Sequence, residues 1–425
     1  MDIISKYAKL IKKRAAANPA AAFQLLRLGL LYESKRVSRL SPEKVPRAYT
    51  KLNVTAIDFV RETMRHPEKA VCVNLFAPAE LLQCFDLKPL SVECFSAFMS
   101  AFLIDDFFID HAELAGMSDT LCSYHKNFAG VLATGVFPKP KMALTTTIAC
   151  DCNVNTFQYL QKKLGVPAKV IDVPYEDTPE NREYVVEQLK ELISYFEQET
   201  GIPYQEEKLK EVLERENQCI ALQREYMELQ ARKYYPSSLT LQLFKLFASH
   251  LFPGSPQALE YYKLLVEDIK TYPDSDPVKI FWVHVMPFYQ KSLQNWFNFN
   301  PEYQVVGMDF DLDNMSPLDV DHPLEALAGK LINNIFNGPY DRKAQRIRDA
   351  LQWMKPEGII HFCHWGCKQS AGGVMELKNA ISDLDIPMLI LDGDGLDRRK
   401  TPDGQIKTRT EAFLELLQNR RGGSK

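Results

Sequence analysis

The sequence lacks the short motifs by which many proteins bind nucleotides. Its 425 residues contain neither a P-loop nor the glycine-rich turn of dinucleotide-binding domains. We therefore expect that this chain does not bind ATP itself. One acidic, glycine-containing stretch, Asp392-Gly393-Asp394-Gly395, follows an apolar run, but its carboxylates would repel phosphate. We predict that this stretch is a flexible turn.

Long apolar runs and a strong net charge are also absent. A membrane helix needs about 18 consecutive apolar residues, and the best candidate, residues 20–32, is interrupted by Arg27. The net charge of -4, with no basic stretch interleaved with aromatics, argues against a nucleic-acid-binding protein. We therefore expect no membrane and no nucleic-acid partner, and a small-molecule ligand instead.

Cysteine is too scarce for a disulfide scaffold but too frequent to ignore. The nine cysteines are an odd number in a large chain, and small secreted domains carry a much higher density. The first 20 residues form a charged, helix-favouring segment and not the apolar segment of a secretory signal. We expect a cytoplasmic protein with reduced thiols, and clustered reduced thiols suggest a metal site.

Two parts of the sequence alternate strands with helices. Runs rich in apolar and β-branched residues predict strands at residues 70–76, 142–148, 170–174, 278–285, 303–309, 358–362 and 387–392. Strands that alternate with helices at this spacing favour a mostly parallel sheet. The predicted fold is therefore α/β, with two Rossmann-like parallel-sheet domains, an N-terminal helical segment and a helical connector.

Composition sets the expected domain boundaries. We predict a basic N-terminal helical segment, a first α/β domain, a helical connector broken near Gly201 and a second α/β domain that ends in a helix from Thr408 to about Asn419. The predicted boundaries are residues 1–65, 66–178, 179–270 and 271–425. A site shared by two domains is expected in the cleft between them.

Five of the cysteines lie in three short segments. Cys363 and Cys367 belong to residues 361–369, which we predict to form a turn between a strand and a helix, where α/β sheets place their chemistry. Cys122 lies in residues 121–126, and Cys150 and Cys152 lie in residues 149–153. We hypothesise that the three segments converge on one iron–sulfur cluster.

Thiolates are the ligands that iron–sulfur clusters require, and three ligands leave one iron open to substrate. We expect Cys122, Cys150 and Cys367 to bind the cluster, with Cys152 and Cys363 as further candidates. These spacings are not diagnostic. Buried structural cysteines remain an alternative, as does zinc bound by Cys363, Cys367 and a histidine. The remaining cysteines, predicted to be core residues, are Cys72, Cys84, Cys94 and Cys219.

Several side chains flank the proposed ligands: Ser123, His125, Lys126, His361, His364 and Trp365. The histidines are suited to donate hydrogen bonds to sulfur or to move protons, although each is also explained as a satisfied structural group. The serine and the lysine fit either contact with the site or roles as a helix cap and a solvated cation. We expect the tryptophan to pack. The catalytic candidates are Ser123, His125 and His364.

Five segments in a fixed order resemble the 2-hydroxyacyl-CoA dehydratase family, which also includes benzoyl-CoA reductase subunits and double-cubane cluster proteins. They are Pro78-Ala79-Glu80-Leu81-Leu82, residues 122–126, Cys150-Asp151, Gly366-Cys367-Lys368-Gln369, and Gly404-Gln405 with residues 408–413. The resemblance extends from about residue 70 to the last helix.

The resemblance implies two α/β domains around a [4Fe–4S] cluster, and a homodimer or a heterodimer of related subunits. It implies a separate ATP-dependent iron–sulfur activator protein that delivers one low-potential electron. In the dehydratases that electron makes a ketyl radical from an (R)-2-hydroxyacyl-CoA thioester, so that an otherwise unreactive β-proton leaves with the hydroxyl. The expected activity is that of an oxygen-sensitive lyase or reductase of anaerobic metabolism.

Other functions fit the same residues. The extra thiols Cys152 and Cys363 would suit a double-cubane [8Fe–9S] cluster protein, an oxidoreductase that reduces small unsaturated molecules. A non-catalytic accessory or maturation subunit would bind its partner through the helical connector. A structural zinc protein would contain no iron.

Overall fold

Two parallel β-sheets form the framework of the molecule, as predicted. The computed structural model describes residues 3–313 and 315–423. The sheets have strand orders β2-β1-β3-β4 and β6-β5-β7-β8, with parallel pairing throughout. The strands are β1 (Ala70–Val73), β2 (Lys88–Ser91), β3 (Met142–Thr146), β4 (Ala168–Ile171), β5 (Val278–Val283), β6 (Tyr303–Met308), β7 (Gly358–His364) and β8 (Met388–Gly393).

Helices cover the first sheet, so its central strands are wholly buried. Every residue of β1 and β3 is buried, as expected for parallel strands with both faces covered. The helices of this part are α4 (Ala79–Gln83), α5 (Val92–Ala101), α6 (Asp105–Leu114), α7 (Ser123–Thr134) and α8 (Asp151–Leu164).

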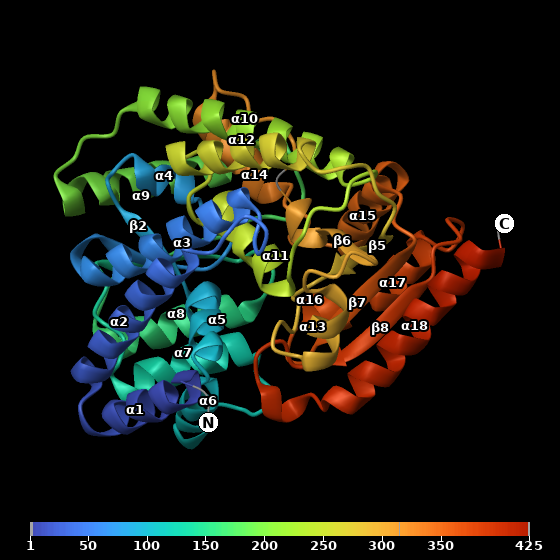
Figure 1. Cartoon of the computed structure of the whole chain (residues 1–425). Coiled ribbons are helices and arrows are strands. Elements are labelled where there is room, and N and C mark those ends of the chain that lie inside the picture. Colours follow the sequence, from blue (N-terminus) through green and yellow to red (C-terminus); the bar gives the residue numbers. More distant parts are fainter. Residues whose placement is uncertain (1–2, 314, 424–425) are drawn as a thin grey trace.

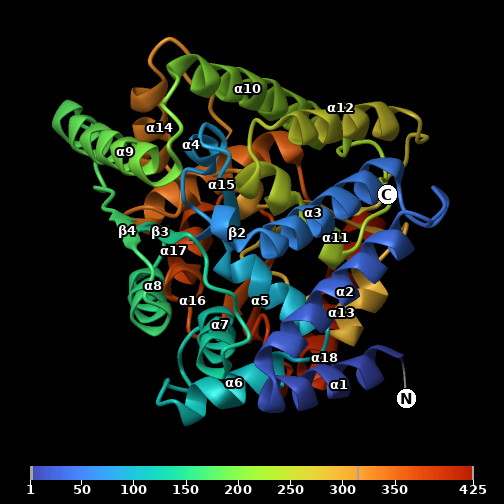
Figure 2. The ribbon, with the colours of Figure 1, turned by 90° about the vertical axis from the view of Figure 1, so that its left-hand side faces the viewer.

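Long helices flank both sheets (Figure 1). The N-terminal helices are α1 (Ile3–Ala17), α2 (Pro19–Val37) and α3 (Arg47–Arg65), followed by the short η1 (Pro67–Lys69). The connector comprises α9 (Pro179–Thr200), α10 (Glu206–Leu229), α11 (Leu239–Leu246), η2 (Phe247–Leu251) and α12 (Pro256–Lys270). Helix α12 packs on α10 and α3, as Figure 2 shows from the side. Among the described residues, no helix combines the length and apolar character needed to cross a membrane.

The predicted break in the connector is confirmed. Thr178 caps α9 by accepting a hydrogen bond from the Asn181 backbone, and Gly201 ends that helix in the left-handed conformation with φ of 69°. Strands β1–β4 and β5–β8 fall within residues 66–178 and 271–425, while the domain boundaries themselves stay a prediction.

The second sheet carries a longer final helix than predicted. The elements around it are α13 (Lys291–Phe297), η3 (Asp309–Asp311), α14 (Pro323–Ile332), α15 (Tyr340–Met354), α16 (Lys368–Ala371), α17 (Val374–Ala380), η4 (Arg398–Lys400) and α18 (Asp403–Gly423). Helix α18 starts before the predicted Thr408 and continues past the predicted Asn419 to Gly423. Its extension has a physical cause, because Leu417 is buried and Arg421 pairs with Glu357 at the far end of the helix.

Strand β7 also runs further than predicted. Cys363 and His364 pair in register with Asp392 and Gly393 of β8, so both belong to the strand. The prediction that they lie on a turn was wrong, and only Cys367 of this segment lies beyond the strand. The turn begins after His364, the last residue of β7 that pairs with β8.

Helices α6 and α7 approach closely at Gly130, which yields a stability prediction. A Cβ at this position would lie 1.7 Å from the Phe108 carbonyl oxygen. We expect Gly130→Ala to lower the free energy of unfolding by about 1–3 kcal/mol, the usual penalty of overpacking, measured as a lower midpoint of urea unfolding.

Gly404→Ala is the matched control for this measurement. Gly404 lies in α18 with nothing within 4 Å of an added Cβ. This variant should be neutral or more stable by up to about 1 kcal/mol, because alanine favours helices. Equal midpoints for the two variants would contradict the close approach at Gly130.

Candidate metal centre

Three of the predicted ligands occupy equivalent places in the fold. Cys122, Cys150 and Cys367 are the residues immediately before α7, α8 and α16. Cys150 follows the central strand β3 of the first sheet, and Cys367 follows strand β7 of the second. The first backbone N–H groups of a helix have no partner within it, and a long helix adds a positive end, so thiolates are favoured before α7 and α8.

The two halves of the molecule meet at Cys122. A Cβ on Gly366 would lie 2.6 Å from the Cys122 backbone nitrogen and 2.8 Å from the Thr120 carbonyl oxygen. The turn that carries Cys367 is therefore in direct contact with the segment that carries Cys122. Gly366 has φ of 81°, so this position strongly favours glycine on both conformational and steric grounds.

Mutual electrostatic effects join the three thiols. Burial raises the pKa of Cys122, and the charges of Cys367 and Cys150 raise it further. Burial likewise raises the pKa of Cys367, with Cys150 again contributing. The charge of Cys150 thus acts on both other thiols, and that of Cys367 acts on Cys122, although Cys367 lies more than 200 positions from the other two in the sequence.

Cys152 joins this group as a fourth thiol. Its hydrogen bond with Cys150 lowers the pKa of Cys150, and the imidazole of His125 lowers it further. The same hydrogen bond raises the pKa of Cys152, to which the charge of Cys122 also contributes. Although burial acts in the opposite direction, the contact with Cys150 leaves the pKa of His125 raised.

The remaining cysteines lie in other surroundings. Burial raises the pKa of Cys363 to about 11, and the charges that act on its thiol are those of Asp392 and Arg409, not those of the other four thiols. The predicted core cysteines Cys72, Cys84 and Cys219 are buried, whereas Cys94 is partly buried at the edge of the core.

His364 is held in one tautomer against Cys122. The backbone N–H of Gly395 donates to His364 Nδ1 at 2.9 Å, so the proton of the neutral ring is on Nε2. Nε2 lies 3.3 Å from Cys122 Sγ and donates to it. Burial lowers the pKa of His364, which keeps the ring neutral.

Other flanking residues depart from their predicted roles. Ser123 donates its hydroxyl hydrogen bond to Asp394 at 2.5 Å and is not a cap. Lys126 is fully buried and pairs with Glu113 at 2.6 Å, so the solvated-lysine alternative was wrong. Trp365 is 46% exposed, so the packing prediction was also wrong, because the chain turns outward after β7. His361 Nε2 lies 3.1 Å from the Ser370 carbonyl oxygen, as expected of a structural histidine.

Residues 392–395 are ordered, contrary to prediction. The Asp394 carboxylate accepts the backbone N–H groups of Leu396 and Asp397 at 2.8 and 2.7 Å, and its own N–H donates to Thr401. The Asp394 carboxylate, which was expected to repel phosphate, thus stabilises its own loop by accepting hydrogen bonds from the backbone.

A buried ion pair near the thiols was not predicted. Lys343 and Asp309 are fully buried and lie 2.6 Å apart. The positive charge acts on Cys367, and together with burial it lowers the pKa of His284. Asp309 is the last residue of a predicted strand, and its place at the carboxyl end of that strand could have marked it as a site residue. Lys343 lies within a helix whose sequence gives no sign of its burial.

The donor set fits an iron–sulfur cluster better than a single ion. Within residues 3–313 and 315–423, no three His, Cys, Asp or Glu side chains are arranged to hold one metal ion, which gives no support to the zinc alternative. A cubane binds each thiolate through a different iron, so its ligands stand farther apart. The partly buried thiols and the N–H donor of His364 suit such a cluster.

Comparisons with known proteins identify the family of this chain. A family model described as 2-hydroxyglutaryl-CoA dehydratase, D-component, matches residues 74–417. The chain belongs to this family. The resemblance predicted from the motifs is thereby confirmed, and with it an enzyme family of dehydratases and reductases.

Similar curated proteins are components of such enzymes. One subunit of the benzoyl-CoA reductase of Thauera aromatica is 24% identical over 83% of this chain and 90% of its own length. The (R)-phenyllactyl-CoA dehydratase alpha subunit of Clostridium sporogenes is 24% identical over 81% of this chain and 88% of its own. The (R)-2-hydroxyisocaproyl-CoA dehydratase alpha subunit of Clostridioides difficile is 22% identical, with 81% and 89% covered.

The pKa directions predict different reactivities for the thiols of the iron-free protein. Because the pKa of Cys150 is lowered, its thiolate persists as the pH falls, and its alkylation rate should change little between about pH 6 and 8. Cys122 and Cys367, whose pKa values are raised, should react about tenfold faster per pH unit over that range. Mass spectrometry of iodoacetamide-treated protein measures each rate.

His125→Ala is the internal control for this prediction. It removes one of the groups that stabilise the Cys150 thiolate, so the pH profile of Cys150 should become steeper. A Cys150 profile as steep as those of Cys122 and Cys367 in the unaltered protein would refute the prediction.

Proposed function

We propose that this chain is an iron–sulfur subunit of a 2-hydroxyacyl-CoA dehydratase-type enzyme, with a [4Fe–4S] cluster bound by Cys122, Cys150 and Cys367. The observation that supports the proposal is the contact between the turn that carries Cys367 and the segment that carries Cys122, together with the effect of the Cys150 charge on both of these thiols. Three ligands would leave one iron open to a substrate oxygen.

When bound, the cluster supplies one-electron transfer and Lewis-acid polarisation of a substrate oxygen. The residues of the chain supply the setting. His364 donates from Nε2 to the Cys122 sulfur, which spreads the negative charge of that ligand. His125 stabilises the Cys150 thiolate, and all three cysteines are partly buried, which limits the access of water that would compete for iron. Ser123 donates to Asp394 and so helps to hold the loop after β8.

The substrate and partners follow from the relatives. The similar proteins are named for acyl-CoA substrates, and each is named as one subunit of its enzyme. We therefore propose an acyl-CoA thioester as substrate, dehydrated or reduced in the cytoplasm, and assembly with a second subunit. The low-potential electron would come from a separate ATP-dependent activator.

Ligand substitution tests the proposal. We expect anaerobically purified protein to contain about four irons and four sulfides per chain, with the brown colour of a cluster. Cys122→Ala, Cys150→Ala and Cys367→Ala should each lose most of the iron, because a three-ligand cluster cannot spare one thiolate.

Cys219→Ala is the matched control, because Cys219 is buried in α10 and away from the site. It should keep the full iron content. Unchanged iron in all three ligand variants, or a colourless parent protein, would exclude the proposed centre.

A double-cubane reductase is the second candidate, favoured by one observation. Cys152 lies beside Cys150 and within electrostatic reach of Cys122, so the site has a thiol beyond the three proposed ligands. About eight irons per chain, falling on Cys152→Ala, would support the larger cluster. About four irons, unchanged in this variant, would leave Cys152 as a neighbour of the cluster and not a ligand.

A further inference from the structure

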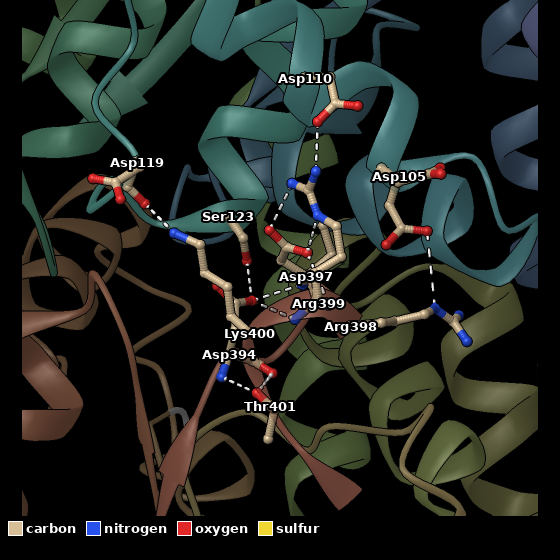
Figure 3. Close-up of polar contacts among 12 residues, drawn as sticks. Asp105, Asp110, Asp119, Ser123, Asp394, Asp397, Arg398, Arg399, Lys400 and Thr401 are labelled. Atoms are coloured by element: carbon tan, nitrogen blue, oxygen red, sulfur yellow. Dashed lines mark hydrogen bonds and ion pairs between the residues drawn. The ribbon is translucent and has the colours of Figure 1, made fainter.

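The loop after β8 reaches across from the second half of the molecule to the first. Figure 3 shows residues of this loop, 394–401, facing α6 and the start of α7. Three consecutive cations each bind a different acceptor there. Arg398 donates to the Ser100 carbonyl at 2.8 Å. Arg399 pairs with Asp110 at 2.5 Å, and Lys400 donates to the Asp119 carbonyl at 2.5 Å.

Hydrogen bonds within the loop support the conformation in which it makes these contacts. Asp394 binds two N–H groups of its own loop, and the Thr401 hydroxyl accepts the Asp394 N–H at 2.6 Å. Asp397 accepts from both Nε and Nη2 of Arg399 at 2.9 Å, which aims Nη1 at Asp110. These internal hydrogen bonds reduce the conformational entropy that the loop loses when its side chains bind the first half.

Both sides of Cys122 are tied to this loop. On the N-terminal side, the Asp119 carbonyl accepts from Lys400 and also from the buried Lys126, at 2.9 Å. On the C-terminal side, Ser123 donates to Asp394. The segment between these two anchors is the one that contacts Gly366.

The same loop also holds the imidazole that faces the Cys122 sulfur. The Gly395 N–H sets the tautomer of His364, and the neighbouring Asp394 holds Ser123. A displacement of the loop would thus move the Cys122 backbone and, at the same time, break the hydrogen bond from Gly395 to His364.

We propose that residues 394–401 form a clamp that positions Cys122 of the first half against Cys367 of the second, so that retention of the metal centre depends on ionic contacts between the halves. Arg399 and Lys400 are positioning residues in this arrangement. The inference rests on the proposed function, because it concerns the same three thiols.

Salt dependence is the signature of such a clamp. Arg399 is 42% exposed and Asp110 is 55% exposed, so their attraction is open to screening by salt. A centre held only by a buried apolar interface would show no such dependence. Two of the proposed ligands belong to the first half and one to the second, so partial opening would remove one ligand from three.

The test is the rate of iron release to a chelator without oxygen, at low and high salt. At low salt, we expect Arg399→Gln/Lys400→Met to release iron about five- to tenfold faster than the parent protein. At high salt, the parent protein should itself release iron faster, so the ratio of the two rates should fall. Lys400→Arg, which keeps the donor, should retain the parent rate.

Arg420→Ala is the matched control. Arg420 pairs with Asp385 at 2.7 Å, and both residues lie in the second half. Breaking this exposed pair should leave iron release unchanged, because it does not join the two halves. Equal acceleration in this variant and the double variant would overturn the clamp.

Amide hydrogen exchange of the iron-free protein gives an independent readout. Residues 115–123 should exchange faster in Arg399→Gln/Lys400→Met than in the parent, and the difference should narrow with salt. Unaltered exchange and unaltered iron release would refute the clamp while leaving the proposed function intact. A parent protein without iron would refute the proposed function. The exchange measurement would still test whether residues 394–401 hold the Cys122 segment, because it needs no iron.

Discussion

The contact between Gly366 and the backbone of Cys122 is the constraint on which the site depends. It is the point where the turn after β7 touches the segment before α7, with no room for a side chain. Any separation there would move Cys367 away from the thiols of the first half. The geometry of the proposed centre is therefore set by how two α/β units pack, not by a local sequence motif.

Each unit contributes thiols for the same physical reason. Parallel strands direct their carboxyl ends to one edge, where the chain turns into a helix and leaves backbone N–H groups free. Cys150 and Cys367 lie at such turns, and Cys122 lies before a helix on the facing side. Negative charge on sulfur is stabilised there without an excess of basic side chains, which agrees with the modest net charge of the chain.

Buried polar groups fix the packing within and between the halves. Lys126 pairs with Glu113 inside the first half, and Lys343 pairs with Asp309 inside the second. The His364 imidazole of the second half donates to Cys122 of the first, and burying that ring without its partner is unfavourable, so this contact disfavours alternative packings of the two halves. The three relatives are 22–24% identical over 81–83% of this chain, so the similarity includes both halves of the molecule.

The sequence by itself determined the two parallel sheets, the helical connector and the family, because strand periodicity, helix caps and ordered motifs are local signals. It also identified residues 121–126, 149–153 and 361–369 as the cysteine-containing candidates for a metal site. Only the tertiary structure decided that Cys152 joins the other thiols while Cys363 faces Asp392, that residues 392–395 are ordered, and that Lys126 is buried. These features arise from contacts between residues far apart in the chain, and local sequence carries no record of such contacts.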